Sequence, residues 1–305
     1  MQYLDGAFWQ VAGSIFLALI PAYIWGYIYY RKNPEDRKMT ALTFLLGGLA
    51  VFPIILYKMS WKYIPWLNAF KIAEPYQNTF INISELVSIP LSVIITFMIV
   101  GMIEELMKLL SVKVADDDEG FRNIDDSIEF FIIAALGFSF TENILYFYNI
   151  WEIEGPSHIF LPFLFRSTFS TFAHIMFSGI FGYYYGIAHF AKPILQEEIR
   201  ENRHHWTKFL HKIFNTKGEK MFHEEKILEG TIVAVGLHAI FNIFLEINLT
   251  FLIVPFLVGG YITLNYLFAK KEDRKVYGKL YSGVRNHPHP KSGVHFVPRP
   301  IHVKG

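Results

Sequence analysis

Cysteine is absent from the 305 residues of the chain. Its absence excludes disulfides and thiolate metal ligands, and it leaves the redox character of the compartment unreadable. An excess of charge of one sign is also missing, since 28 Lys and Arg stand against 27 Asp and Glu, a formal net charge of +1. So small a net charge names no charged partner, and we expect no nucleic acid among the partners.

Hydrophobic residues are abundant instead, at 52% of the chain, and aromatic residues reach 17%, with 30 Phe and 17 Tyr. This balance is typical of a polytopic membrane protein whose helices face lipid and carry aromatic belts. The first thirty residues have no basic n-region, yet their apolar run is long enough to span a bilayer. They therefore predict an uncleaved first membrane helix rather than a signal peptide.

Seven apolar runs are long enough to cross a membrane. They fall at roughly 8–30, 40–57, 85–112, 127–150, 159–191, 227–247 and 250–269. Seven spans place the loops that carry most of the Lys and Arg on one side of the membrane, together with the C-terminal tail. By the positive-inside rule that side is cytoplasmic, and the N-terminus is outside. The predicted fold is an all-α, polytopic bundle of about seven transmembrane helices.

Four segments are expected along the chain. Residues 1–84 hold two membrane helices and a loop rich in Trp and Tyr, which is either interfacial or re-entrant. Residues 85–250 form the membrane core with the candidate catalytic residues, and 251–269 form the last helix. The basic tail, 270–305, has the composition of a disordered cytoplasmic segment. Within the core, the mixture of charged and aromatic residues at 192–226 favours a short amphipathic helix on the inner leaflet.

Two carboxylates and an ammonium, Glu104, Glu105 and Lys108, lie near the end of the third apolar run. Each charge in hydrocarbon costs about 2.5 kcal/mol or more, so such groups are kept where they face a protein interior or a water-filled cavity. Glu104 and Lys108 are four residues apart and are expected to pair on one helical face. Glu105 is rotated by about 100° and would then face elsewhere. The structural alternative is an ion pair that only locks two helices together.

Three later runs also carry polar side chains that lipid disfavours. These are Glu142 and Asn143 in the fourth run, Arg166 and His174 in the fifth, and His238 and Asn242 in the sixth. Arg166 lies early in its run, where snorkelling to the outer interface is favoured. The histidines and Asn242, taken singly, have the alternative role of hydrogen-bonding neighbouring helices together. Their joint occurrence on consecutive spans favours one wet pocket instead.

Peptide hydrolysis is chemistry that such a pocket can perform. It needs an activated water, a donor for the developing oxyanion and a proton for the leaving amine. Lys108 is placed to keep Glu104 ionised, so that Glu104 can deprotonate water. His238 and Asn242 share a helical face and would form an oxyanion clamp.

A metal-dependent version of the same hydrolysis stays open, because two His and one Glu form a recognised catalytic zinc set. Its ligands would be Glu142, His174 and His238, and its cofactor zinc. The residue after His238 is Ala239, so the His-Glu-x-x-His helix of zinc proteases is absent. The metal-free scheme requires no cofactor.

Three short motifs follow one another on successive predicted helices. Residues 104–108 match the pattern EExxK, residues 138–142 match FxxxE, and residues 238–242 match HxxxD/N. In these motifs the chain resembles the PrsW family of intramembrane proteases, which are distantly similar to the CAAX prenyl protease and bacteriocin-processing superfamily. Arg166 and the segment 174–186 also resemble the fifth-helix signature of that family. The resemblance covers roughly residues 85–250.

The resemblance implies a peptide hydrolase in the bacterial cytoplasmic membrane that cleaves membrane-anchored proteins, with anti-sigma factors as the expected substrate class. The residues carried over as catalytic are Glu104 or Glu105 as the base, Glu142 and His174 to polarise and position, and His238 with Asn242 to hold the oxyanion. The supporting residues are Lys108, Phe138 and Asn143. Asn242 stands where many members have Asp, which favours an oxyanion amide over a metal-binding carboxylate.

Two other classes of function stay open from the sequence. Buried Glu, His and Lys also mark ion pathways, so a transporter or proton relay is one of them. The absence of a recognisable inverted repeat counts against it. The other is a catalytically inactive scaffold that binds membrane proteins through the same groove.

Overall fold

The computed structural model describes residues 2–30, 37–84, 87–119, 121, 123–192, 194–195 and 218–272. Most of these residues are helical. The predicted amphipathic helix within 192–226 lies largely outside the described residues, and so does nearly all of the predicted disordered tail. The order of the described elements agrees with a helical bundle of a multi-pass membrane protein.

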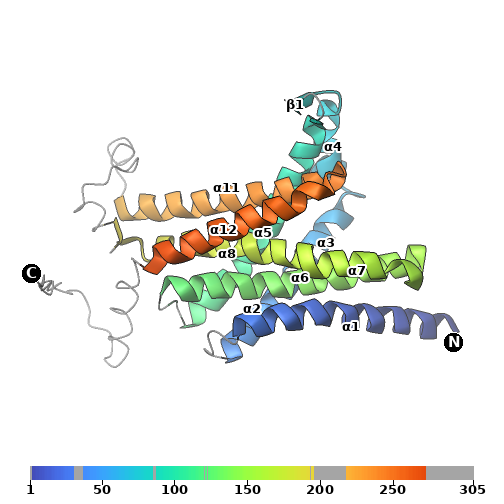
Figure 1. Cartoon of the computed structure of the whole chain (residues 1–305), viewed down its shortest axis with the longest axis horizontal. Helices are drawn as coiled ribbons and strands as arrows, with labels where there is room; N and C mark the ends of the chain where they lie inside the picture. The colour runs from blue at the N-terminus through green and yellow to red at the C-terminus, as the bar shows by residue number, and fades with distance from the viewer. Residues whose placement is uncertain are drawn as a thin grey trace, which may run out of the picture.

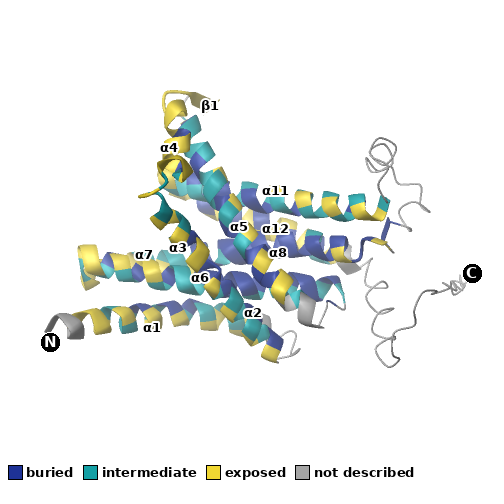
Figure 2. Cartoon of the chain, turned by 180° about the vertical axis from the view of Figure 1, so that it is seen from behind, coloured by how far each residue is buried: buried dark blue, intermediate teal, exposed yellow. Residues whose placement is uncertain are grey.

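Five long helices run along the long axis of the molecule (Figure 1). They are α1 (Gln2–Tyr30), α6 (Ile124–Glu154), α8 (Thr171–His189), α11 (Gly218–Glu246) and α12 (Ile253–Glu272). α8 is central, because it packs against α6 on one side and against α11 and α12 on the other. Figure 2 shows α8 almost entirely buried, whereas α1 is mostly half-buried or exposed. The core of the bundle is therefore built around α8.

Shorter elements form the first part of the span that ends with α8. It begins with the 3-10 turn η3 (Pro156–His158) and α7 (Phe160–Phe165), and continues through the π-helical segment η4 (Arg166–Ser170). Another 3-10 turn, η5 (Thr250–Leu252), leads into α12. π-helical turns are rare, and they occur mostly as single widened turns inside α-helices, frequently at functional sites.

The remaining long helix, α5 (Leu91–Glu119), crosses the bundle at an angle (Figure 1). It packs on α11 along one face and on α2 (Arg37–Leu49) along another. α3 (Val51–Ser60) follows α2 almost directly and also contacts α5. Because α5 touches α11 and α2, it carries its side chains into the middle of the bundle.

The segment between α3 and α5 is not simply helical. It contains η1 (Pro65–Leu67), α4 (Ala69–Ala73) and η2 (Glu74–Tyr76). Two short antiparallel strands follow, β1 (Phe80–Ser84) and β2 (Val87–Pro90). In their register Ile81 lies opposite Ile89 and Asn82 opposite Ser88. The all-α prediction is wrong for this hairpin and correct for the long helices.

Six helices are long and apolar enough to cross a membrane, by length and composition, within the described residues. They are Gly6–Ile28, Lys38–Ser60, Ile124–Glu154, Pro156–His189, Gly218–Glu246 and Thr250–Ala269. α5 is not among them, because every stretch of 18 residues within it contains Glu104, Glu105 and Lys108. Whether α5 crosses the membrane, as the third of seven predicted spans, therefore stays a prediction. The placement of the termini depends on that count and stays a prediction too.

Glycine brings α2 and α6 into backbone contact. A Cβ on Gly137 would collide with the carbonyl of Phe44, and a Cβ on Gly47 would collide with the carbonyl of Ala134. Small residues at helix crossings in membranes permit this close approach. Gly137 directly precedes Phe138, so the crossing fixes the FxxxE segment against α2.

We expect Gly137→Ala to destabilise the protein by about 1–3 kcal/mol, the usual cost of forcing a methyl group into a packed core. Gly259→Ala on α12 is the matched control, because a Cβ there meets no atom within 4 Å. Helix propensity alone should make the control neutral or slightly stabilising. Thermal unfolding in detergent measures both variants, and equal melting temperatures would contradict the close crossing.

Candidate active site

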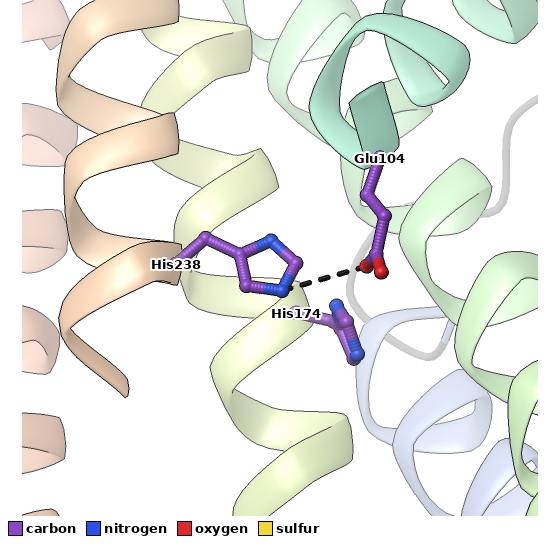
Figure 3. A group of neighbouring side chains, drawn as sticks. All are labelled: Glu104, His174 and His238. Atoms are coloured by element: carbon purple, nitrogen blue, oxygen red, sulfur yellow. Dashed lines mark ion pairs between the residues drawn. The ribbon is translucent and has the colours of Figure 1, made fainter. Parts of the chain in front are cut away.

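Three helices bring one acidic and two imidazole side chains to a common point. Glu104 comes from α5, His174 from α8 and His238 from α11, and their side chains turn toward one another (Figure 3). All three are buried, and one ligand atom from each lies within 4.8 Å of the others. The sequence thus separates these residues by up to 134 positions, and the helix packing brings them together.

Glu104 meets His238 at the centre of this group. Glu104 Oε2 lies 3.4 Å from His238 Nε2, the interaction drawn in Figure 3. The same Oε2 is buried and has no hydrogen-bond partner among the residues that the structure describes. A buried carboxylate oxygen without a partner is costly, so its presence indicates a place for a ligand, a water or a cation.

Glu105, rather than Glu104, pairs with the lysine. Lys108 Nζ donates to Glu105 Oε1 at 2.6 Å, and both side chains are 0% exposed. The predicted pair of Glu104 with Lys108 is therefore wrong, and so is the prediction that Glu105 faces elsewhere. Residues three apart on a helix are neighbours just as residues four apart are, so the spacing alone permits either pair. Contacts with other helices decide between them.

His238 is oriented by Glu105. Its Nδ1 lies 2.8 Å from Glu105 Oε1, and because a carboxylate accepts hydrogen bonds, Nδ1 carries the proton. In the neutral ring, Nε2 then holds a lone pair that faces Glu104. A carboxylate that fixes the tautomer of a histidine in this way is the usual support of a histidine ligand in a metal site.

His174 is held from both sides. Lys108 Nζ lies 3.1 Å from its Nδ1, which must accept because an ammonium only donates. Its Nε2 then donates to Glu142 Oε2 at 3.0 Å. Both ring nitrogens are thus engaged, and His174 would have to give up one of these hydrogen bonds to bind a metal.

Arg166 lies inside this network. Its Nη2 donates to Glu142 Oε2 at 2.7 Å and its Nε donates to Asn143 Oδ1 at 2.6 Å. The guanidinium also lies over the ring of Tyr146, 4.4 Å from its centroid. The side chain is 13% exposed. The prediction that Arg166 snorkels to the outer interface is wrong, because α6 offers it a carboxylate and an amide.

The supporting residues differ in their surroundings. Phe138 lies beside the cluster, with Lys108 Nζ 4.6 Å from its ring centroid and the ring of His174 5.6 Å away. Asn143 donates from Nδ2 to Thr171 Oγ1 at 3.4 Å. Asn242 is half-buried on α11, and no hydrogen bond of its side chain is found among the described residues. Asn242 is therefore one helical turn from His238, but no hydrogen bond found among the described residues joins its side chain to the cluster.

Thr171 and Ser139 belong to the cluster although no sequence motif predicted them as site residues. Their hydroxyls lie 3.1 Å apart, and both side chains are buried between α6 and α8. Each lies in a predicted apolar run, where a single hydroxyl is common and carries no signal of its own. Ser139 does lie directly after Phe138, inside the FxxxE motif, which is the one feature that could have drawn notice to it.

The donor set fits a divalent cation in part. If Glu104 is ionised and His238 neutral, Oε2 and Nε2 face each other as two acceptors, so a proton or a cation must lie beside them. Three carboxylates, on Glu104, Glu105 and Glu142, face only two permanent cations in the network, Lys108 and Arg166. The predicted metal set contained Glu142, whereas the carboxylate that converges with His174 and His238 is that of Glu104.

One of three comparisons with known proteins gives a match. The family model described as PrsW family intramembrane metalloprotease matches residues 35–268. The chain belongs to this family, and it is accordingly a peptide hydrolase and an integral, multi-pass membrane protein. Comparison with curated proteins and with solved structures gives no match.

We expect Lys108→Met to lower the free energy of unfolding by about 3–5 kcal/mol, because it leaves Glu105 buried without its cation. Lys226→Met is the control. Lys226 Nζ lies 2.6 Å from Glu229 Oε2, a similar pair, but the side chains are 18% and 41% exposed. The control should lose about 1 kcal/mol or less. Denaturant unfolding in micelles compares them, and equal losses would mean that Lys108 is not the counter-charge of a buried acid.

Proposed function

We propose that the chain is an intramembrane endoprotease that hydrolyses a peptide bond of a membrane-anchored protein with a water bound at Glu104. The observation that carries the proposal is the buried, unpartnered Oε2 of Glu104, 3.4 Å from His238 Nε2. A water that touches both atoms would satisfy them and would lie against a carboxylate base. The membership of the chain in a protease family supports the same chemistry.

The side chains divide the work of hydrolysis. Glu104 takes a proton from the attacking water and returns it to the leaving amine, the two proton transfers that peptide hydrolysis needs. Glu105 holds His238 with its Nε2 toward the reaction centre. Lys108 supplies the positive charge that keeps Glu105 an acceptor. Asn242, four residues after His238 and half-buried, would donate to the carbonyl oxygen of the scissile bond in this proposal.

The family's description as a metalloprotease adds a second form of the same hydrolysis. Glu104, His174 and His238 would hold the ion, and zinc bound there would polarise the carbonyl and acidify water. With Glu104 engaged as a ligand, Glu142 would accept the proton of the water. Glu142 has the exposure for this role, since its side chain is 31% exposed against 9% for Glu104.

The exposure of Glu142 and the family of the chain both bear on the substrate. Glu142 is the most exposed acid of the cluster, so we infer that water and a peptide approach the cluster from its side. The class of substrate is a membrane-anchored protein, and by the family resemblance an anti-sigma factor in the bacterial cytoplasmic membrane. A chain segment that enters from within the bilayer would have to be unwound before water could attack it, because a helix hides its carbonyls in hydrogen bonds.

We further infer that α5 also crosses the membrane, which brings the number of spans to seven. The N-terminus is then outside and the C-terminus cytoplasmic. The 29 residues of α5 are about 43 Å long at 1.5 Å per residue, enough to cross a bilayer. The exposed positions at a spacing of four are all apolar: Met98, Met102, Leu106, Leu110 and Val114. The charged residues of its middle part face inward. Lipid would therefore meet an apolar face along the middle of α5.

Cleavage of a tagged single-pass substrate in proteoliposomes tests the protease. We expect Glu104→Gln to lower the rate of cleavage by at least about 10²-fold, because an amide cannot take a proton from the attacking water as the carboxylate does. The matched control is Glu229→Gln, which removes a carboxylate of α11 that pairs with Lys226 outside the cluster. Cleavage by Glu104→Gln at the rate of the control would overturn the assignment. Substrate flux without cleavage would favour a transporter.

A chelator separates the two forms of the reaction. In the metal-dependent form, dialysis against a strong chelator should abolish cleavage and one equivalent of zinc should restore it. In the metal-free form the rate should not change. Elemental analysis of the purified protein, with His238→Ala for comparison, gives an independent readout of bound metal.

The topology is tested by single-cysteine labelling, for which a chain without cysteine needs no prior engineering. Gln77→Cys lies before α5 and Lys113→Cys near its end, and both positions are exposed. We expect a membrane-impermeant maleimide to label Gln77→Cys on intact cells, and Lys113→Cys only after the cells are opened. Labelling of both from outside would mean that α5 does not cross.

A further inference from the structure

The widened turn between α7 and α8 begins at Arg166. The backbone N–H of Thr171 donates to the carbonyl of Arg166, five residues earlier, and the hydroxyl of Thr171 donates to the same carbonyl at 3.0 Å. A π-helical turn rotates the residues on its two sides relative to an unbroken helix. Arg166 and His174 are eight residues apart in sequence, yet both reach Glu142 Oε2.

A closed ring of hydrogen bonds holds Arg166 in place. Its Nε donates to Asn143 Oδ1 at 2.6 Å, Asn143 Nδ2 donates to Thr171 Oγ1 at 3.4 Å, and Thr171 Oγ1 donates to the carbonyl of Arg166. The ring ties the side chain of Arg166 to its own backbone through two other residues. The guanidinium therefore has a fixed orientation before any substrate arrives.

The guanidinium in turn holds two consecutive residues of α6. Side chains of neighbouring residues on a helix point about 100° apart, so few groups can contact both. Arg166 does so because its Nε and Nη2 are separate donors in one rigid plane. Lysine would keep the charge but has no such fork, so it cannot reproduce this geometry.

Glu142 passes this orientation to His174. Its Oε2 accepts from Arg166 Nη2 at 2.7 Å and from His174 Nε2 at 3.0 Å. As long as Glu142 accepts at Nε2, the lone pair of His174 is on Nδ1, on the side of Lys108. Without Arg166 the partly exposed Glu142 would be free to turn toward water, and the Nε2–H of His174 would lose its acceptor.

We propose that Arg166 is a positioning residue of the protease, which acts through Glu142 to fix the orientation of the His174 ring. The inference rests on the proposed function, since it assigns a role within that reaction. A purely structural salt bridge between α6 and the start of α8 is the competing account. The two differ in what they change: positioning affects turnover in a folded enzyme, whereas a structural bridge affects stability.

The experiment compares wild type, Arg166→Lys, Arg166→Ala and Thr171→Val in the proteoliposome cleavage assay. Lys226→Ala, which removes a cation of α11 outside the cluster, is the control. We expect Arg166→Lys to lower kcat by about 10-fold to 100-fold, the usual effect of losing a group that orients a site residue. KM should stay within about twofold, because the substrate does not contact Arg166 in this account.

Guanidinium rescue of turnover, at a melting temperature that does not change, supplies a readout that a structural role would not give. Millimolar guanidinium should restore part of the activity of Arg166→Ala and none of the activity of Arg166→Lys, whose ammonium fills the site. Thr171→Val keeps the shape of the side chain but opens the ring, so it should lower kcat less than Arg166→Lys does. Thermal melts of each variant, run alongside, detect loss of fold.

The outcomes separate the two levels of the proposal. Wild type that cleaves, together with Arg166→Lys that turns over at the wild-type rate, would overturn the positioning role and leave the protease intact. A rise in KM at constant kcat would also overturn it, in favour of substrate binding. Wild type that fails to cleave would overturn the proposed function and this inference with it. If Arg166→Ala does not fold, the Lys and Val variants decide.

Discussion

The buried contact of Lys108 with Glu105 is the interaction on which the rest of the site depends. Neither side chain reaches solvent, so the pair is stable only because each charge finds its partner at 2.6 Å. The same carboxylate oxygen also accepts from His238, and the same ammonium donates to His174. One ion pair on α5 thus sets the orientation of two imidazoles on two other helices. Glu104, its neighbour in sequence, is left without such a partner and is available for chemistry.

Much of the fold is predictable from the sequence because a long apolar run is stable in the bilayer as a helix, whatever the rest of the chain does. The helical spans follow from run length, and six of them satisfy the criteria of length and composition. The β-hairpin escaped prediction because its strands are only five and four residues long and include Asn and Ser, which carry little strand signal. The aromatic residues just before it suggested an interfacial segment instead.

The candidate site divides in the same way. The motifs point to the right region because charges in apolar runs are expensive and therefore rare. They do not determine which acid meets the lysine, since Lys108 is three residues from Glu105 and four from Glu104. The acid that pairs with Lys108 also accepts a hydrogen bond from His238, which lies 133 residues from Glu105 in the sequence. Arg166 was misplaced for a similar reason, because its partner on α6 is visible only once the helices are packed.

The charged middle of α5 has a consequence for biosynthesis. If α5 spans the membrane, as proposed, it carries three charges into the bilayer, and each opposes insertion by about 2.5 kcal/mol or more. Its partners His174 and His238 lie on α8 and α11, which leave the ribosome later. During that interval Glu105 and Lys108 can pair only with each other, and Glu104 has no partner on another helix, so α5 would be secured only after α11 although it is among the first helices to be made. Of the proposed spans, α5 would therefore depend most on being held beside the translocon, or by a chaperone, until its partner helices are made.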